Sequence, residues 1–87
     1  MIRTYLIDDH TAVRQAVATM LETADDIEVV GQAGDVPGGV AEVAALRPDV
    51  VLLDLKLPGM GGLSAIPQIQ EVAASSRIVV FTMSHTR

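Results

Sequence analysis

Residues 49–62 read DVVLLDLKLPGMGG, an apolar run that stops at Asp54 and continues into a loop with one proline and three glycines. A second apolar run, at residues 5–7, stops in the same way at the acidic pair Asp8 and Asp9. Apolar runs bounded by turn residues are typical of strands buried in a parallel sheet. If these two strands are neighbours, their three carboxylates meet at the carboxyl edge of the sheet.

Carboxylates gathered in this way repel one another. Two unit charges about 5 Å apart, at an effective dielectric constant of about 20, repel by roughly 3 kcal/mol. The sequence therefore predicts a divalent cation beside Asp8, Asp9 and Asp54. A nucleophilic carboxylate held next to such a cation is suited to accept a phosphoryl group.

The composition is that of one small globular domain. The chain has 87 residues, of which 49% are hydrophobic. It has no cysteine, which excludes disulfides and thiolate metal sites and suits a reducing cytoplasm. The net charge of −5 argues against direct binding of nucleic acid. No stretch suits a signal peptide or a membrane span, so we expect a cytoplasmic protein without a membrane partner.

Strand and helix patterns alternate along the chain, which predicts an α/β fold with a parallel sheet and crossover helices. We expect strands at residues 3–7, 27–33, 50–54 and 78–83, and helices at about 13–24, 36–47 and 63–74. The first helix has one apolar stripe, which we interpret as core packing that the missing last helix leaves partly uncovered: Val13, Ala16, Val17, Met20, Leu21 and Ala24.

The second and third expected helices each have a weak point. Gly38 and Gly39 each cost about 1 kcal/mol relative to alanine in a helix, although Asp35 suits the N-cap position. Pro67 lacks a backbone N–H, so we expect the third helix to begin late or to kink at that residue.

These residues resemble, over almost the whole chain, the receiver domain of bacterial two-component response regulators. The resemblance rests on LIDDH at 6–10, PDVVLLDL at 48–55 with PGM at 58–60, and IVVFTMS at 78–84. The strand VVGQA at 29–33 is similar to the subgroup that joins the receiver to a LuxR-type helix-turn-helix DNA-binding domain. The resemblance implies a flavodoxin-like, three-layer fold with strand order 2-1-3-4, lacking the final helix, strand and helix of a full receiver.

The resemblance also implies roles for the site residues. Asp54 is the expected phosphoacceptor, which a sensor histidine kinase phosphorylates. Asp8, Asp9 and Asp54, with the main-chain carbonyl of Lys56, are the expected ligands of Mg²⁺, and Asp8 acts through a water molecule. Thr82 is the expected switch hydroxyl, which hydrogen-bonds the new phosphoryl group.

The chain departs from the family pattern at one important residue. Receivers have a lysine at the end of a fifth strand, whereas the only lysine here is Lys56, close to the acceptor. We therefore interpret residues 1–87 as a receiver domain that is incomplete at its C-terminus, either an excerpt of a longer regulator or a truncated product. A sheet that ends at residues 78–83 exposes an apolar edge strand, so we expect the fragment to self-associate. Contact with DNA is expected only through an output domain outside this chain.

Several alternatives stay open. Asp8 and Asp9 also suit the start of the first helix as capping residues, and we interpret His10 as a helix-start residue rather than a ligand. A phosphatase of the haloacid dehalogenase type has a second aspartate two residues after its nucleophile, where this chain has Lys56, so we do not expect an enzyme. The acidic turn after the first strand disfavours a flavin phosphate. A pseudo-receiver that serves only protein interaction or dimerisation is the main alternative.

Overall fold

The computed structural model describes residues 1–55 and 62–81, which form four strands and three helices. The strands are β1 (Ile2–Ile7), β2 (Ile27–Ala33), β3 (Val50–Asp54) and β4 (Arg77–Phe81). The helices are α1 (Thr11–Glu22), α2 (Val36–Leu46) and α3 (Gly62–Val72). All four strands are parallel and lie in the order β2-β1-β3-β4. The predicted α/β class and strand order are confirmed.

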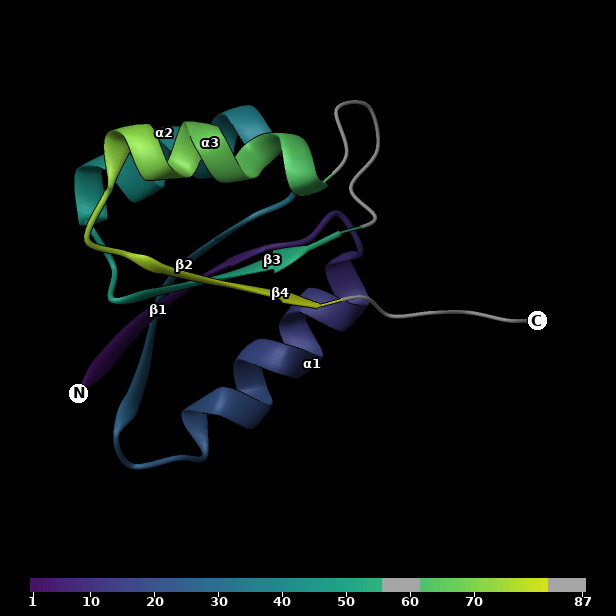
Figure 1. Ribbon diagram of the computed structural model, residues 1–87. Coiled ribbons are helices and arrows are strands. Elements are labelled where there is room, and N and C mark those ends of the chain that lie inside the picture. Colours follow the sequence, from purple (N-terminus) through teal and green to yellow (C-terminus); the bar gives the residue numbers. More distant parts are fainter. Residues whose placement is uncertain (56–61, 82–87) are drawn as a thin grey trace.

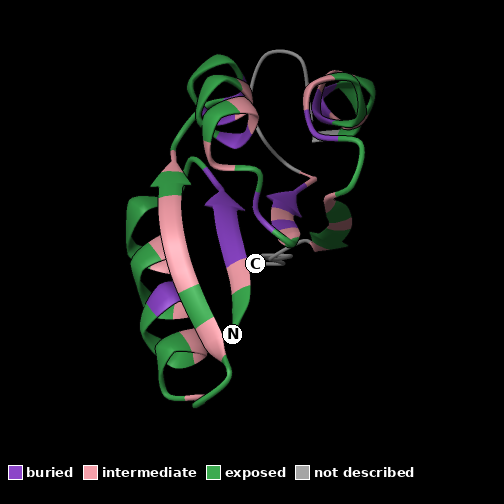
Figure 2. Cartoon of the chain, turned by 90° about the vertical axis from the view of Figure 1, so that its left-hand side faces the viewer, coloured by how far each residue is buried: buried purple, intermediate pink, exposed green. Residues whose placement is uncertain are grey.

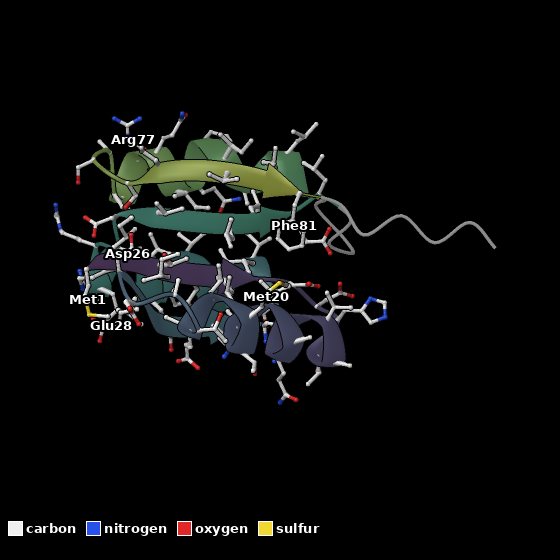
Figure 3. All side chains as sticks on the ribbon, turned by 90° about the horizontal axis from the view of Figure 1, so that it is seen from below. Met1, Met20, Asp26, Glu28, Arg77 and Phe81 are labelled. Atoms are coloured by element: carbon white, nitrogen blue, oxygen red, sulfur yellow. The ribbon has the colours of Figure 1, made fainter. Side chains whose placement is uncertain are left out.

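The elements form three layers (Figure 1). Helices α2 and α3 lie together on one face of the sheet, and α1 lies on the other. Helix α1 packs over β2 and β1, so β3 and β4 have no helix of the described residues over them on that face (Figure 3). Within the described ranges, no helix is long and apolar enough to cross a membrane.

The main core lies between the sheet and the layer of α2 and α3. Figure 2 shows buried segments along β1 and β3 and on the sides of these two helices that face the sheet. Alternate side chains of each strand point to this face, because the side-chain direction reverses at every residue. The fully buried members of this core are Tyr5, Ile7, Val43, Val51, Leu53, Ala65 and Ile69.

The apolar stripe predicted for α1 is only partly core packing. Ala18, which is not in the stripe, is the buried residue of this helix. Ala16 is exposed, and Met20 is 63% exposed (Figure 3). The difference arises because α1 packs toward β2, which turns the stripe partly away from the sheet.

Helix α2 approaches β1 closely, and this explains the second of its two glycines. A Cβ atom at Gly39 would lie 2.7 Å from Cδ1 of the buried Ile7. At the start of α2, the Asp35 carboxylate accepts a hydrogen bond from the Gly38 N–H at 2.7 Å, as the N-cap prediction requires. The helix ends one residue earlier than predicted, because Arg47 has a left-handed backbone with φ of 47° ahead of a proline.

Tyr5 links β1 to α2 through the one hydroxyl group of the main core. The Tyr5 hydroxyl donates to Glu42 Oε1 at 2.5 Å. Burial raises the pKa of Tyr5 above its usual range, and the hydrogen bond to Glu42 raises it further. A Cβ atom at Gly31 of β2 would lie 2.7 Å from the Tyr5 ring, and the pairing of β1 with β2 shifts register just before this point. Glycine at position 31 therefore makes room for the ring.

The predictions for the third helix and the last strand need correction. Helix α3 begins at Gly62 and ends at Val72, and Pro67 lies inside it. The alternative of a late start is therefore excluded, and the alternative of a kink at Pro67 stays a prediction. Leu63, whose carbonyl loses its helical donor at Pro67, is exposed like Pro67 itself, so water can satisfy that oxygen. Strand β4 begins one residue earlier than predicted. Residues 82 and 83 of the predicted strand lie outside the described residues.

Candidate functional site

The three predicted acidic residues come together at the carboxyl edge of the sheet. Strands β1 and β3 pair in parallel with Ile7 opposite Leu53, so Asp8 and Asp54 follow at the same level. Asp9 lies in the turn between β1 and α1. One carboxylate oxygen from each of the three aspartates lies within 4.8 Å of the others. The structure therefore places three carboxylates around a single point.

Asp8 is held by hydrogen bonds at all of its polar atoms but one. Its N–H donates to the Ala33 carbonyl at 3.0 Å, and its own carbonyl accepts from Arg14 Nη1 at 2.7 Å. Its Oδ1 accepts the His10 N–H at 2.8 Å. The remaining atom, Oδ2, is buried and has no hydrogen-bond partner. A buried anionic oxygen without a donor is costly, so this atom calls for a cation or a proton.

Burial sets the electrostatics of the cluster. Asp8 and Asp54 are 1% and 4% exposed, whereas Asp9 faces solvent. Burial raises the pKa of Asp8, and the neighbouring Asp54 and Asp9 carboxylates raise it further. The His10 N–H bond acts in the opposite direction and lowers the pKa of Asp8. When the Asp8 carboxylate is ionised its Oδ2 lacks a donor, which agrees with the raised pKa of Asp8.

The donor set fits a small, hard divalent cation. Mg²⁺ prefers carboxylate and carbonyl oxygens and usually keeps several of its water molecules. Here two buried carboxylates and one solvent-facing carboxylate lie close enough to share one ion, and the solvent side leaves room for water. A cation at this point would offset the mutual repulsion of the aspartates and would pair with Asp8 Oδ2.

His10 takes the part that the sequence predicts for it. It is the N-cap residue of α1, with an extended backbone and no capping hydrogen bond from its side chain. The interpretation of His10 as a helix-start residue is confirmed. The capping alternative for Asp8 is only partly realised, because its carboxylate accepts the N–H of His10 rather than an N–H inside the helix.

Two predicted site positions cannot be placed. Lys56 and Thr82 lie outside the described residues, and their roles stay predictions. In contrast, the structure shows one contact that was not predicted: the Arg14 guanidinium bonds the main chain of Asp8. The position of Arg14 one turn after His10 was the only signal in the sequence, and it does not reveal which carbonyl the side chain reaches.

Comparison with known proteins agrees with this geometry. The model of the response regulator receiver domain family matches residues 4–87. The transcriptional regulatory protein LiaR of Bacillus subtilis is 46% identical over 82 residues, which are 94% of this chain and 39% of LiaR. A protein-glutamate methylesterase/protein-glutamine glutaminase of Cereibacter sphaeroides is 40% identical over 84 residues, 97% of this chain but only 23% of that protein.

A solved structure extends the likeness to three dimensions. The LuxR-family two-component response regulator from Aurantimonas sp. SI85-9A1 superimposes with a TM-score of 0.88 at 35% sequence identity. The match covers 95% of this chain and 59% of that one. The chain thus spans well under two thirds of the length of these relatives, and what they share with it is the receiver part. This chain belongs to the response regulator receiver domain family.

Proposed function

We propose that this chain is the phosphoacceptor of a two-component signalling system, in which a sensor histidine kinase phosphorylates Asp54 with the aid of Mg²⁺. Two observations carry the proposal: Asp8 Oδ2 is a buried oxygen without a hydrogen-bond partner, and one carboxylate oxygen each of Asp8, Asp9 and Asp54 lies within 4.8 Å of the others. Membership of the receiver family supports the same assignment. Asp8, Asp9 and Asp54 would hold the ion, together with the predicted carbonyl of Lys56.

The proposed reaction is a transfer of one phosphoryl group. A carboxylate oxygen of Asp54 attacks phosphorus, and a P–O bond forms as the P–N bond of the donor phosphohistidine breaks. The leaving nitrogen keeps the electron pair and takes up a proton. Burial of Asp54 keeps its carboxylate poorly hydrated. Asp8 and Asp9 would hold the cation beside Asp54, at the carboxyl edge of the sheet. Bound Mg²⁺ supplies positive charge toward the phosphoryl oxygens.

The proposed output is a change of surface rather than a released product, with Thr82 as the switch hydroxyl. LiaR is a transcriptional regulatory protein, and the chain matches 39% of its length. We therefore propose a cytoplasmic regulator in which a DNA-binding domain outside these residues reads the state of the receiver. The net charge of −5 supports the proposal that the receiver itself does not bind DNA. The esterase activity of the Cereibacter relative is not carried over, because only 23% of that protein is matched.

Self-association belongs to the same proposal. Within the described ranges, β4 pairs with β3 on one side and with no strand on the other. Its central residues Val79 and Val80 are 48% and 42% exposed. An unpaired apolar strand edge of this kind favours pairing with another chain.

The metal site is tested by the melting temperature of the chain with and without Mg²⁺ and beryllofluoride, a mimic of the phosphoryl group. We expect both to raise the melting temperature through preferential binding to the folded state. Asp54→Asn should abolish the response to beryllofluoride, whereas Asp25→Asn, in an exposed turn, should keep it. An unchanged melting temperature with Mg²⁺ would refute the proposed metal site.

A pseudo-receiver is the second candidate, and one feature favours it. Lys56 is the only lysine among residues 1–87, and a lysine of a fifth strand is not among these residues. We expect slow phosphorylation by acetyl phosphate, detected by mass as one labile phosphoryl group on Asp54. If Mg²⁺ binds but neither acetyl phosphate nor beryllofluoride modifies the chain, including in a longer version, the pseudo-receiver is the better description.

A further inference from the structure

We propose that Arg14 is a positioning residue for the acidic cluster: by holding the main chain of Asp8, its guanidinium sets where the Asp8 carboxylate meets Asp54. The inference rests on the proposed Mg²⁺ site and concerns a residue outside the set of ion ligands. Arg14 lies in the first half of α1 and touches the cluster from behind, through the backbone rather than the carboxylates.

The guanidinium lies across the carboxyl ends of β1 and β2. Arg14 Nη1 donates to the Asp8 carbonyl at 2.7 Å, and Nε donates to Gln32 Oε1 of β2 at 3.2 Å. Gly34, just after β2, leaves space for this arrangement, because a Cβ atom there would lie 3.0 Å from Arg14 Nη1. One side chain thus connects α1, the end of β1 and the end of β2.

The position of Asp8 depends on such an anchor. Repulsion from the Asp54 and Asp9 carboxylates acts to move Asp8 away from the cluster. The hydrogen bonds that oppose this motion come from the Ala33 carbonyl, the His10 N–H and Arg14. The bond from Arg14 has a charged donor and the bond from His10 has a charged acceptor, and such bonds are shorter and stronger than neutral ones. Of the three, only the bond from Arg14 comes from a side chain, so it is the one that a substitution removes.

The sign of one measurement separates this role from a simple charge effect. Arg14 carries a positive charge near a site for a cation. If it acted only through that charge, its removal would make Mg²⁺ bind more tightly. If it positions Asp8, its removal loosens the turn and Mg²⁺ binds more weakly. The two roles therefore predict opposite changes in affinity.

The test is calorimetric titration of the 87-residue chain with MgCl₂, at fixed ionic strength. We expect Arg14→Gln to weaken Mg²⁺ binding about tenfold, as is typical for partners that orient metal ligands. Arg14→Lys keeps the charge but only one of the two contacts, so we expect a loss of about threefold. Gln32→Ala removes only the contact to Nε, so a loss of no more than about twofold is expected.

Arg3→Gln is the matched control. Arg3 also donates to two main-chain carbonyls, those of Leu46 and Arg47, at 2.8 and 3.1 Å. It lies at the amino end of β1, away from the acidic cluster. The substitution removes the same charge and a similar structural contact, so it should lower the melting temperature and leave the affinity for Mg²⁺ unchanged.

Each outcome decides between the ideas. Unchanged or tighter Mg²⁺ binding by Arg14→Gln, or a loss of equal size in Arg3→Gln, would overturn the positioning role. If Arg14→Gln does not fold, Arg14→Lys takes its place, and wild-type affinity in that variant would overturn the role equally. If the wild-type chain itself binds no Mg²⁺, the proposed function fails, and the positioning role fails with it. The results for the Arg14 variants bear only on the positioning role.

Discussion

The surroundings of Asp8 destabilise its charged carboxylate, and the rest of the fold holds the residue in place. Its carboxylate is buried beside that of Asp54, and one of its oxygens has no donor. Three hydrogen bonds to its other polar atoms keep it in place. A site of this kind is poised for an ion because the chain alone leaves its charge unbalanced.

Replacement of Asp8 by asparagine should stabilise the metal-free chain. Asp8→Asn keeps the shape of the side chain but removes one of the repelling charges, so we expect the free energy of unfolding at neutral pH to rise by on the order of 1–3 kcal/mol. The stabilisation by Mg²⁺ should fall in the same variant, because one ligand charge is lost. Urea unfolding with and without MgCl₂ measures both effects. The control Asp25→Asn should change neither, and a less stable metal-free Asp8→Asn would contradict the electrostatic account.

The pH dependence of stability provides a separate check on Asp8. Its pKa is raised above the ordinary value of 3.8, so the folded chain holds this proton more tightly than the unfolded chain does. The stabilising contribution is therefore complete below pH 3.8 and is lost as the pH rises through the folded pKa. We expect the advantage of Asp8→Asn over the wild type, measured without Mg²⁺, to grow from about pH 4 to about pH 7. An advantage that stays constant over this range would mean that Asp8 does not titrate as the geometry requires.

Among the elements, α2 shows how packing overrides helix propensity. The sequence marks Gly38 and Gly39 as unfavourable in a helix, yet α2 forms and buries Val36 and Val43 against the sheet. Gly39 is required because α2 passes so close to Ile7 that no Cβ atom fits without movement. The local cost of glycine is thus offset by close contact between helix and strand.

Gly39→Ala should therefore destabilise the protein, although alanine favours helices. The new methyl group would press on the fully buried Ile7, and overpacking of this kind costs about 1–3 kcal/mol. Denaturant unfolding measures the change. Ile7→Val removes the Cδ1 atom, so the same glycine substitution should cost less in that background. A gain in stability from Gly39→Ala in the wild-type background would show that α2 moves away from β1 without cost.

The elements also show which features could be read from the sequence. Strand β3 was predicted with its observed bounds, because a solid apolar run lies between Asp49 and Asp54. The stripe on α1 is only partly covered, and periodicity identifies such an apolar face but not which strands the helix covers. The start of α3 was predicted to within one residue, and Pro67 is tolerated inside the helix because it lies at the surface.

The acidic cluster could be predicted from the sequence, whereas the Arg14 contact behind it could not. Asp8 and Asp54 each end an apolar run, and neighbouring parallel strands must bring such ends together. The Arg14 contact depends instead on the chain after β2, where Gly34 leaves space for the guanidinium. Nothing in the local pattern around Arg14 encodes a neighbour that is twenty residues away. The cluster of carboxylates was therefore predictable from the strand ends, and the Arg14 contact only from the three-dimensional structure.

For the molecule as a whole, the open side of β4 predicts association that depends on concentration. Val79→Lys places a charge in the middle of the exposed strand, where natural sheets use lysine to prevent edge pairing. We expect the wild-type chain to show a larger mass in light scattering as its concentration rises, and Val79→Lys to shift it toward the monomer. Gln70→Lys adds the same charge on an exposed position of α3 and should leave the association unchanged. A wild-type chain that is monomeric at every concentration would refute the prediction.

The contact between Tyr5 and Glu42 has a practical consequence. The chain has one tyrosine, one phenylalanine and no tryptophan, so emission excited beyond the absorption of phenylalanine comes from a single ring in an inner strand. That ring lies in β1, three residues before Asp8, and its hydroxyl is bound to a carboxylate of α2. Fluorescence of the unlabelled protein therefore reports the surroundings of one buried ring between β1 and α2, and a stopped-flow trace would follow the burial of that ring during refolding.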